Sequence, residues 1–182
     1  FSTYLYTGNH SSQSINNGID LSGEGGLVWI KARTAPSNNN ELCDTVQGVN
    51  RGLSSNNTHY AVSTTITSFN NDGFNINNSG SYSNNMNDVD YVSWTFRKAP
   101  GFFDVVTYTG NGGSTGGAGD DGSNSRDVPH NLGTTPGMIL VKCVDNSGGW
   151  FVWHKDYQNT TTDWMSLSTT GGVNSHSNMW GD

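Results

Sequence analysis

The sequence has few charged residues and few hydrophobic ones. Only 13% of its 182 residues are charged and 32% are hydrophobic. Lys, Glu, Arg, Ala and Leu build stable helices, so their scarcity argues against a helical bundle. No window approaches the roughly 18 consecutive apolar residues of a membrane-spanning helix, so we expect no membrane insertion. The eight basic residues are outnumbered by fifteen acidic ones and form no cluster, which argues against nucleic-acid binding.

Cysteine is almost absent as well. The two cysteines, Cys43 and Cys143, both lie in segments with strand-like sequence. The internal repeat described below does not place them at equivalent positions. We therefore expect two separate thiols that behave as small hydrophobic residues, with a disulfide as the alternative.

Polar turn-forming residues and aromatic rings make up much of the remainder. Asn, Gly, Ser and Thr account for about half of the sequence, and 11% of the residues are aromatic, including six tryptophans. That much ring surface is incompatible with a solvated, disordered coil. The composition therefore predicts a folded all-β protein with a polar surface and many turns.

The chain contains an internal repeat. Residues 1–9 recur, with substitutions, as residues 103–111, and residues 26–31 line up with residues 137–142. A Gly-rich insert at residues 112–122 lengthens the second copy. Two apolar blocks in the same order, with matched glycines, indicate two related units of about 100 residues each, the usual size of a small β-sandwich domain.

The repeat divides the chain near residue 101. We expect a first β-sandwich module at residues 1–101 and a second at residues 102–182. The first module ends with the strand-like residues 90–98, which have no counterpart in the second module. A missing strand would expose a sheet edge, which folded proteins avoid. We therefore expect the second module to be incomplete and the sequence to be an excerpt of a longer chain.

Strand patterns occur in both units. Residues 27–30 and 138–141 are continuous apolar runs, typical of buried central strands. Residues 64–76 predict a hairpin, because Asp-Gly at its centre supplies the turn. Residues 156–164 contain three threonines and can form one helical turn at most. Short strands at this spacing predict antiparallel β-sandwiches of jelly-roll or concanavalin-like type, almost without helix.

Aromatic residues must supply much of the core of so small a sandwich. Residues 91–96 alternate, which predicts that Val92, Trp94 and Phe96 face the core together. Burying one large apolar side chain contributes about 1.5–3 kcal/mol. The full set expected to be buried is Tyr6, Val28, Ile30, Phe69, Phe74, Val92, Trp94 and Phe96 in the first unit, and Val106, Tyr108, Ile139, Val141 and Trp153 in the second.

The titratable residues do not converge on a catalytic pattern. The five histidines are scattered without metal-ligand spacing. Asp88 and Asp90 share one face of a strand, but they would need a partner across a cleft to act as glycosidase acid and base. A solvated rim is the alternative for this pair. We therefore expect no enzyme activity and assign no catalytic residue.

The loop at residues 119–127 is rich in side-chain oxygens. Asp120, Asp121, Asn124 and Asp127 are candidate ligands for calcium, since a hard cation prefers oxygen ligands. The loop does not follow the EF-hand pattern, and an exposed loop without metal is the alternative. No other cofactor is expected.

Aromatic residues crowd the last quarter of the chain. Sugar rings stack on aromatic faces while polar side chains bind their hydroxyl groups, so this crowding is compatible with carbohydrate binding. Packing in the core or between domains is the alternative. The candidate ligand-binding residues are Trp150, Trp153, His154, Tyr157 and Trp164.

Segments from nearly the whole chain carry a resemblance to a known family. They are residues 1–9, 25–31, 68–74, 91–96, 97–103, 129–133 and 136–139. Together they resemble a domain of tailed-phage virion proteins, common in phages of marine bacteria including cyanobacteria, which is itself similar to concanavalin-like sandwiches. The Gly-rich insert and the missing final strand of the second unit depart from this pattern.

The resemblance implies a non-enzymatic structural protein on the surface of the virion. A tail fibre, a head fibre or another appendage that contacts the host fits this description, with copies of itself or other virion proteins as partners. A carbohydrate-binding adhesin that recognises a host-surface glycan is the rival, and a glycan-degrading enzyme ranks last.

Overall fold

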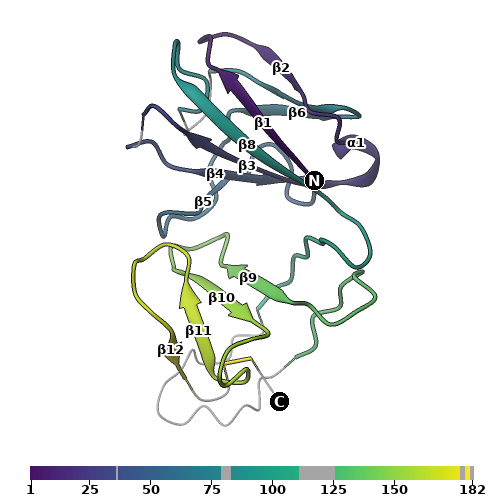
Figure 1. Ribbon diagram of the computed structural model, residues 1–182, viewed down its shortest axis with the longest axis vertical. Helices are drawn as coiled ribbons and strands as arrows, with labels where there is room; N and C mark the ends of the chain where they lie inside the picture. Colours follow the sequence, from purple (N-terminus) through teal and green to yellow (C-terminus); the bar gives the residue numbers. More distant parts are fainter. Residues whose placement is uncertain (36, 79–82, 111–125, 177–178, 181–182) are drawn as a thin grey trace.

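The computed structural model describes residues 1–35, 37–78, 83–110, 126–176 and 179–180. These residues form two lobes, one above the other in Figure 1, built from antiparallel strands. The four-residue α1 (Leu21–Glu24) is the one helix in these ranges, and it is far too short to cross a membrane. The all-β architecture expected from the composition is confirmed.

A five-stranded antiparallel sheet forms one layer of the first lobe. Its strand order is β1-β8-β3-β4-β5, so the strand nearest the end of the module lies between β1 and β3. The last strand of the module thereby holds the first one in the sheet. The strands are β1 (Ser2–Thr7), β3 (Gly26–Ala32), β4 (Glu41–Asp44), β5 (Leu53–Ser54) and β8 (Asp90–Arg97).

A three-stranded sheet of order β2-β7-β6 forms the other layer. Strands β6 (Ile66–Asn70) and β7 (Gly73–Ile76) are the predicted hairpin, and β2 (Gln13–Asn16) pairs with β7. Gly73 has a φ of 150°, and a Cβ there would lie 1.9 Å from the backbone oxygen of Ile15. Glycine is therefore required where the hairpin leaves its turn.

The two sheets of the first lobe pack face to face on a common core. The rings of Tyr6 and Tyr91 stack within it, 5.1 Å apart and 14° from parallel. An antiparallel sandwich is thus present, whereas the expected jelly-roll connectivity is not confirmed. The core contains Tyr6, Ile15, Leu21, Val28, Ile30, Ala32, Cys43, Ile66, Phe74, Ile76 and Tyr91.

Val92, Trp94 and Phe96 do not face this core, and the prediction that they do is wrong; Val92 is buried, but on the outer side of the sheet. Ser93 and Thr95, the residues that alternate with them, are fully buried and face the core. The sequence predicts the alternation in β8 correctly but places the wrong set of side chains on the core side. Small side chains suffice on the core side of β8 because the facing sheet supplies bulky ones such as Phe74.

The second lobe is a four-stranded antiparallel sheet of order β12-β11-β10-β9. In the part of the lobe that the structure describes, β9 pairs with β10 alone and its other side is a sheet edge. The residues expected to allow one helical turn form turns that lead into β11. The strands are β9 (Met138–Lys142), β10 (Trp150–His154), β11 (Asp163–Ser166) and β12 (Asn174–Ser175).

The repeat is only partly expressed as repeated structure. Strand β9 aligns with β3, and β9 pairs with β10 as β3 pairs with β4. Residues 104–110, which repeat β1, form no strand. Accordingly, Tyr6 is 9% exposed and its counterpart Tyr108 is 49% exposed. In the first lobe β1 is held by β8, and no described strand of the second lobe takes the place of β8.

The burial of the expected core residues follows the same division. Those of the first unit are mostly buried, whereas those of the second unit are not, because the second sheet has no second layer among the described residues. Buried as expected are Tyr6, Val28, Ile30, Phe74 and Val92; partly buried are Phe69, Trp94, Phe96, Val141 and Trp153; exposed are Val106, Tyr108 and Ile139.

The lobes contact each other through a second apolar cluster. Trp150 at the start of β10 packs against Leu42 and Leu53 of the first sheet. The indole Nε1 of Trp150 donates a hydrogen bond of 2.8 Å to the backbone oxygen of Ser54. Trp150 thus anchors the second lobe to the outer face of the first.

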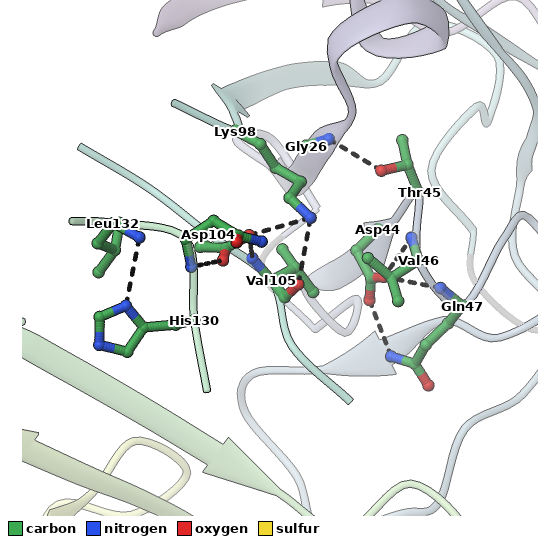
Figure 2. A network of polar contacts seen from close by, with 11 residues as sticks. Gly26, Asp44, Thr45, Val46, Gln47, Lys98, Asp104, Val105, His130 and Leu132 are labelled. Atoms are coloured by element: carbon green, nitrogen blue, oxygen red, sulfur yellow. Dashed lines mark hydrogen bonds and ion pairs between the residues drawn. The ribbon is translucent and has the colours of Figure 1, made fainter. Parts of the chain in front are cut away.

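A polar network fixes the junction between the modules, as Figure 2 shows. The carboxylate of Asp104 lies 3.0 Å from Lys98 Nζ and accepts hydrogen bonds from the backbone N–H groups of Val105 and Asn131. Burial by itself raises the pKa of Asp104, but the hydrogen bonds from Asn131 and Lys98 outweigh it and lower the pKa. The junction is therefore a bonded corner and not a loose linker.

The two cysteines are free thiols, as expected. Cys43 is fully buried in β4, and Cys143 is exposed directly after β9. Burial raises the pKa of the Cys43 thiol, so this group behaves as a hydrophobic core residue.

Candidate functional site

The outer face of the five-stranded sheet carries large side chains where β3 and β8 meet. Trp29 lies opposite Trp94, and Leu27 lies opposite Phe96. Directly opposed residues of an antiparallel pair project to the same side of the sheet. The rings that the sequence assigned to the core are therefore gathered on the face that is turned away from it.

A hollow of about 350 Å³ opens on this face. Its lining consists of Trp29, Lys31, Asn40, Trp94 and Phe96. The two indoles meet edge to face, with ring centroids 5.8 Å apart and planes at 68°. Lys31 Nζ donates a hydrogen bond of 3.3 Å to Asn40 Oδ1. The hollow thus combines aromatic walls with a polar pair.

A row of phenylalanines continues from the hollow toward the junction. The ring of Phe96 lies 4.9 Å from that of Phe1 and 5.2 Å from that of Phe103. Phe103 in turn lies 6.4 Å from Phe102. Phe1 and Phe102 are both more than half exposed. This row extends the aromatic surface beyond the hollow and connects it with the start of the second module.

The hollow has the chemistry to bind a ring-shaped polar ligand. Lys31 and Asn40 contribute polar groups of the kind that hydrogen-bond hydroxyl groups or an anionic substituent. The aromatic walls offer apolar faces against which the C–H face of a sugar stacks.

The predicted ligand-binding residues of the second unit do not form one site. Alternation along β10 places Trp150 and His154 on one face of the sheet and Trp153 on the other. The register of β10 with β11 places Trp164 on the same face as Trp153. Trp150 is buried against the first lobe, where it has a packing role.

The remaining candidates also make contacts within their own lobe. The indole of Trp153 donates a hydrogen bond of 2.7 Å to the backbone oxygen of Thr160. Trp164 packs on Phe151 with ring centroids 4.9 Å apart. The hydroxyl of Tyr157 donates to the backbone oxygen of Val152, and the rings of Tyr157 and His154 lie 6.2 Å apart.

The predicted calcium loop lies largely outside the described residues. Asp120, Asp121 and Asn124 belong to the part that is not described, and Asp127 is exposed. Within the described ranges, no group of three or more His, Cys, Asp or Glu side chains could hold a metal ion. The calcium assignment therefore stays a prediction from the sequence.

One titratable group of the first lobe is strongly perturbed. Glu41 on β4 is fully buried, and its burial raises its pKa from 4.5 to about 7. Its carboxylate accepts hydrogen bonds from the N–H of Thr65 at 3.2 Å, from Thr65 Oγ1 at 2.7 Å and from Asn84 Nδ2 at 2.5 Å. These bonds oppose the effect of burial without cancelling it.

Sequence reasoning missed Trp29, Lys31 and Asn40 as site residues. A usable signal was present in β3, where Lys31 has the same alternation phase as Trp29. A lysine avoids full burial, so its phase marks the outer side of the strand. Asn40 lies outside the strands and carries no comparable signal.

The chain belongs to a family described as a domain of unknown function (DUF7483), whose model matches residues 1–182. No curated protein and no solved structure matches the chain. The family match covers both lobes and the junction between them.

Proposed function

We propose that the chain is a non-enzymatic structural protein of a phage virion, part of a tail fibre, head fibre or similar surface appendage. One observation carries this proposal: two β modules with a common strand pair follow each other and are joined by the bonded corner at Lys98 and Asp104. Related modules in fixed succession suit an elongated appendage, in which each unit contacts its neighbours. The virion setting rests on the resemblance of the sequence.

The composition supports the same proposal. About half of the residues are Asn, Gly, Ser or Thr, and only 13% are charged. The solubility of such a surface depends little on charge and hence little on screening by salt. Appendage proteins act as symmetric, multivalent assemblies, so the partners are copies of this chain or other virion proteins.

Localisation on purified particles tests this proposal. Antibodies against the recombinant chain are used for immunogold electron microscopy of phage particles from the source of the sequence, and mass spectrometry identifies the particle proteins. We expect regular labelling at one substructure of the particle surface. Absence of the chain from particles, together with its recovery from the infected cell lysate, would contradict the structural role.

The hollow favours a second function, binding of a host-surface glycan. Trp94 and Phe96 offer ring faces beside the polar pair of Lys31 and Asn40. This combination of stacking surface and hydrogen-bonding groups is the one that sugar rings require. Glycan binding and a structural role are compatible in one appendage protein.

A glycan array followed by calorimetry with the best ligand tests this second function. We expect Trp94→Ala to weaken binding at least tenfold, a loss of about 1.4 kcal/mol in binding free energy. Trp153→Ala serves as the matched control, because Trp153 is also partly buried but lies on the second sheet. If Trp153→Ala abolishes binding and Trp94→Ala does not, the site is on the second sheet and the hollow is excluded.

A further inference from the structure

We propose that the free edge of β9 binds an extended peptide strand in antiparallel register, with the alternating sequence pattern of β8, and that this strand also pairs with residues 104–110. The interaction is β-strand addition, in which backbone hydrogen bonds supply affinity and alternate side chains supply specificity. The proposal does not depend on the virion setting or on glycan binding.

The first lobe contains the template for this interaction. There β8 lies between β1 and β3 and pairs with both over most of its length. Trp94 lies opposite Trp29 on one side and opposite Thr3 on the other. A strand in this position therefore pairs with a neighbouring strand on each of its two edges.

The second lobe repeats the template without its central strand. Residues 137–142 align with residues 26–31, so β9 is the counterpart of β3. Strand β10 occupies the side of β9 that corresponds to β4, with Met138 opposite His154 as Leu27 is opposite Asp44. The other side of β9, which corresponds to the place of β8, has no strand within the described ranges.

The exposure of apolar side chains marks the same edge. Met138, Ile139 and Leu140 are 51%, 36% and 39% exposed, whereas Val28 and Ile30 of the equivalent strand are fully buried. Proteins usually protect an edge strand with charges, proline or a bulge. Strand β9 has one charged residue, at its end, and its ladder with β10 is regular.

Residues 104–110, which would lie on the other side of the added strand, also expose apolar side chains. They repeat the sequence of β1, yet they form no strand. Val106 and Tyr108 in this segment are 38% and 49% exposed. Because β1 pairs with β8 alone, its counterpart has no partner strand among the described residues. One added strand thus accounts for both exposed regions.

The register of the template specifies the chemistry of the added strand. If the added strand pairs with β9 as β8 pairs with β3, an aromatic residue equivalent to Phe96 lies opposite Met138. A second one, equivalent to Trp94, lies opposite Leu140. The intervening positions are small and hydroxylated, as Thr95 is in β8. β8 of a second folded copy cannot serve, because both of its edges are already paired.

A synthetic peptide with the sequence of residues 89–98 tests the proposal with the 182-residue protein. Binding is followed by fluorescence anisotropy of the labelled peptide, and pairing by hydrogen exchange. We expect saturable one-to-one binding, with new protection of the amides of residues 104–110 and 138–142. A scrambled peptide of the same composition is expected not to bind.

Two matched variants identify the edge that is used. Leu140→Lys changes an exposed leucine on β9, and Leu5→Lys changes a 58% exposed leucine on β1, the free outer strand of the first sheet. We expect Leu140→Lys to weaken peptide binding at least tenfold and Leu5→Lys to leave it unchanged. Circular dichroism establishes whether each variant folds, and hydrogen exchange of the unmodified protein decides the question if Leu140→Lys does not fold.

Several results overturn the proposal. One is the absence of binding at millimolar peptide, and another is binding that Leu5→Lys abolishes while Leu140→Lys does not. A third is concentration-dependent dimerisation in the ultracentrifuge with protection of residues 138–142 in the absence of peptide. That result would assign the edge of β9 to a second copy of the chain.

Discussion

Raising the pH is expected to destabilise the first lobe through Glu41. The pKa of this buried carboxyl is about 7 in the folded protein and 4.5 at its ordinary value. Between these two values the folded state keeps a proton that the unfolded state releases. The free energy of unfolding therefore falls as the pH rises through this interval, and Glu41 causes no further change with pH below 4.5 or above about 7.

The size of the effect follows from the width of the interval. Each pH unit contributes about 1.4 kcal/mol for one proton. From 4.5 to about 7 the loss of stability is about 3 kcal/mol. This is a large fraction of the roughly 5–15 kcal/mol by which a domain is usually stable.

Glu41→Gln removes the titration and keeps the shape of the side chain. Like the protonated carboxyl, the amide brings a donor that needs an acceptor. The Oδ1 of Asn84 is buried and has no partner among the residues that the structure describes, and rotation of the Asn84 amide would direct this oxygen to residue 41. We therefore expect the variant to match the unmodified protein near pH 5 and to exceed its stability by about 3 kcal/mol at pH 8.

Urea unfolding at pH 5 and pH 8, followed by tryptophan fluorescence, measures this difference. Glu24→Gln is the matched control, because Glu24 is the only other glutamate of the chain and is exposed on α1. The control is expected to retain the pH dependence of the unmodified protein. Equal pH dependence in the unmodified protein and in Glu41→Gln would refute the assignment.

Three further predictions concern packing and access. Trp150→Phe keeps an aromatic ring but removes the indole hydrogen bond between the lobes, so unfolding should become easier by about 1 kcal/mol in urea titrations. Gly73→Ala forces a Cβ against the backbone of Ile15 and should cost about 3 kcal/mol or more, measured as a lower thermal midpoint. A thiol reagent should modify Cys143 rapidly and Cys43 only after unfolding, as counted from absorbance with and without denaturant.

Local signals in the sequence identified several strands of the first unit. Asp72-Gly73 between two apolar segments identified the hairpin, because few residues other than glycine tolerate the backbone conformation found there. The apolar run at residues 27–30 identified β3, which lies at the centre of the sheet. Helix α1 was missed because four residues carry no periodic pattern.

The face that each strand turns to the core was harder to predict. Alternation groups Val92, Trp94 and Phe96 correctly, but it does not say on which side of the sheet the group lies. Because these three side chains are large, they were the natural candidates for the core side. In the structure the core side of β8 carries the small residues Ser93 and Thr95. Which set faces the core depends on the size of the side chains that the facing sheet contributes. That contribution is defined only when the two sheets pack together.

The hollow on the first sheet could not be found from the sequence for a related reason. Closeness in the sequence, as for Trp150 and Trp153, does not place two side chains on one face of a sheet. On a strand, residues an odd number of positions apart project to opposite faces, so this proximity is lost. Trp29 and Trp94 are 65 positions apart, yet strand pairing brings them face to edge. Only the register of β3 with β8 brings them together.

The repeat also bears on how many ligand sites one chain can hold. In the second unit Leu140 stands where the first unit has Trp29. Even with an added strand that carries aromatic residues at the positions of Trp94 and Phe96, the wall that Trp29 forms in the first unit would be aliphatic in the second. Aliphatic groups lack the flat aromatic face on which a sugar stacks. One glycan site per chain is therefore expected whether or not β9 is occupied, so calorimetry with and without the added strand should give the same stoichiometry.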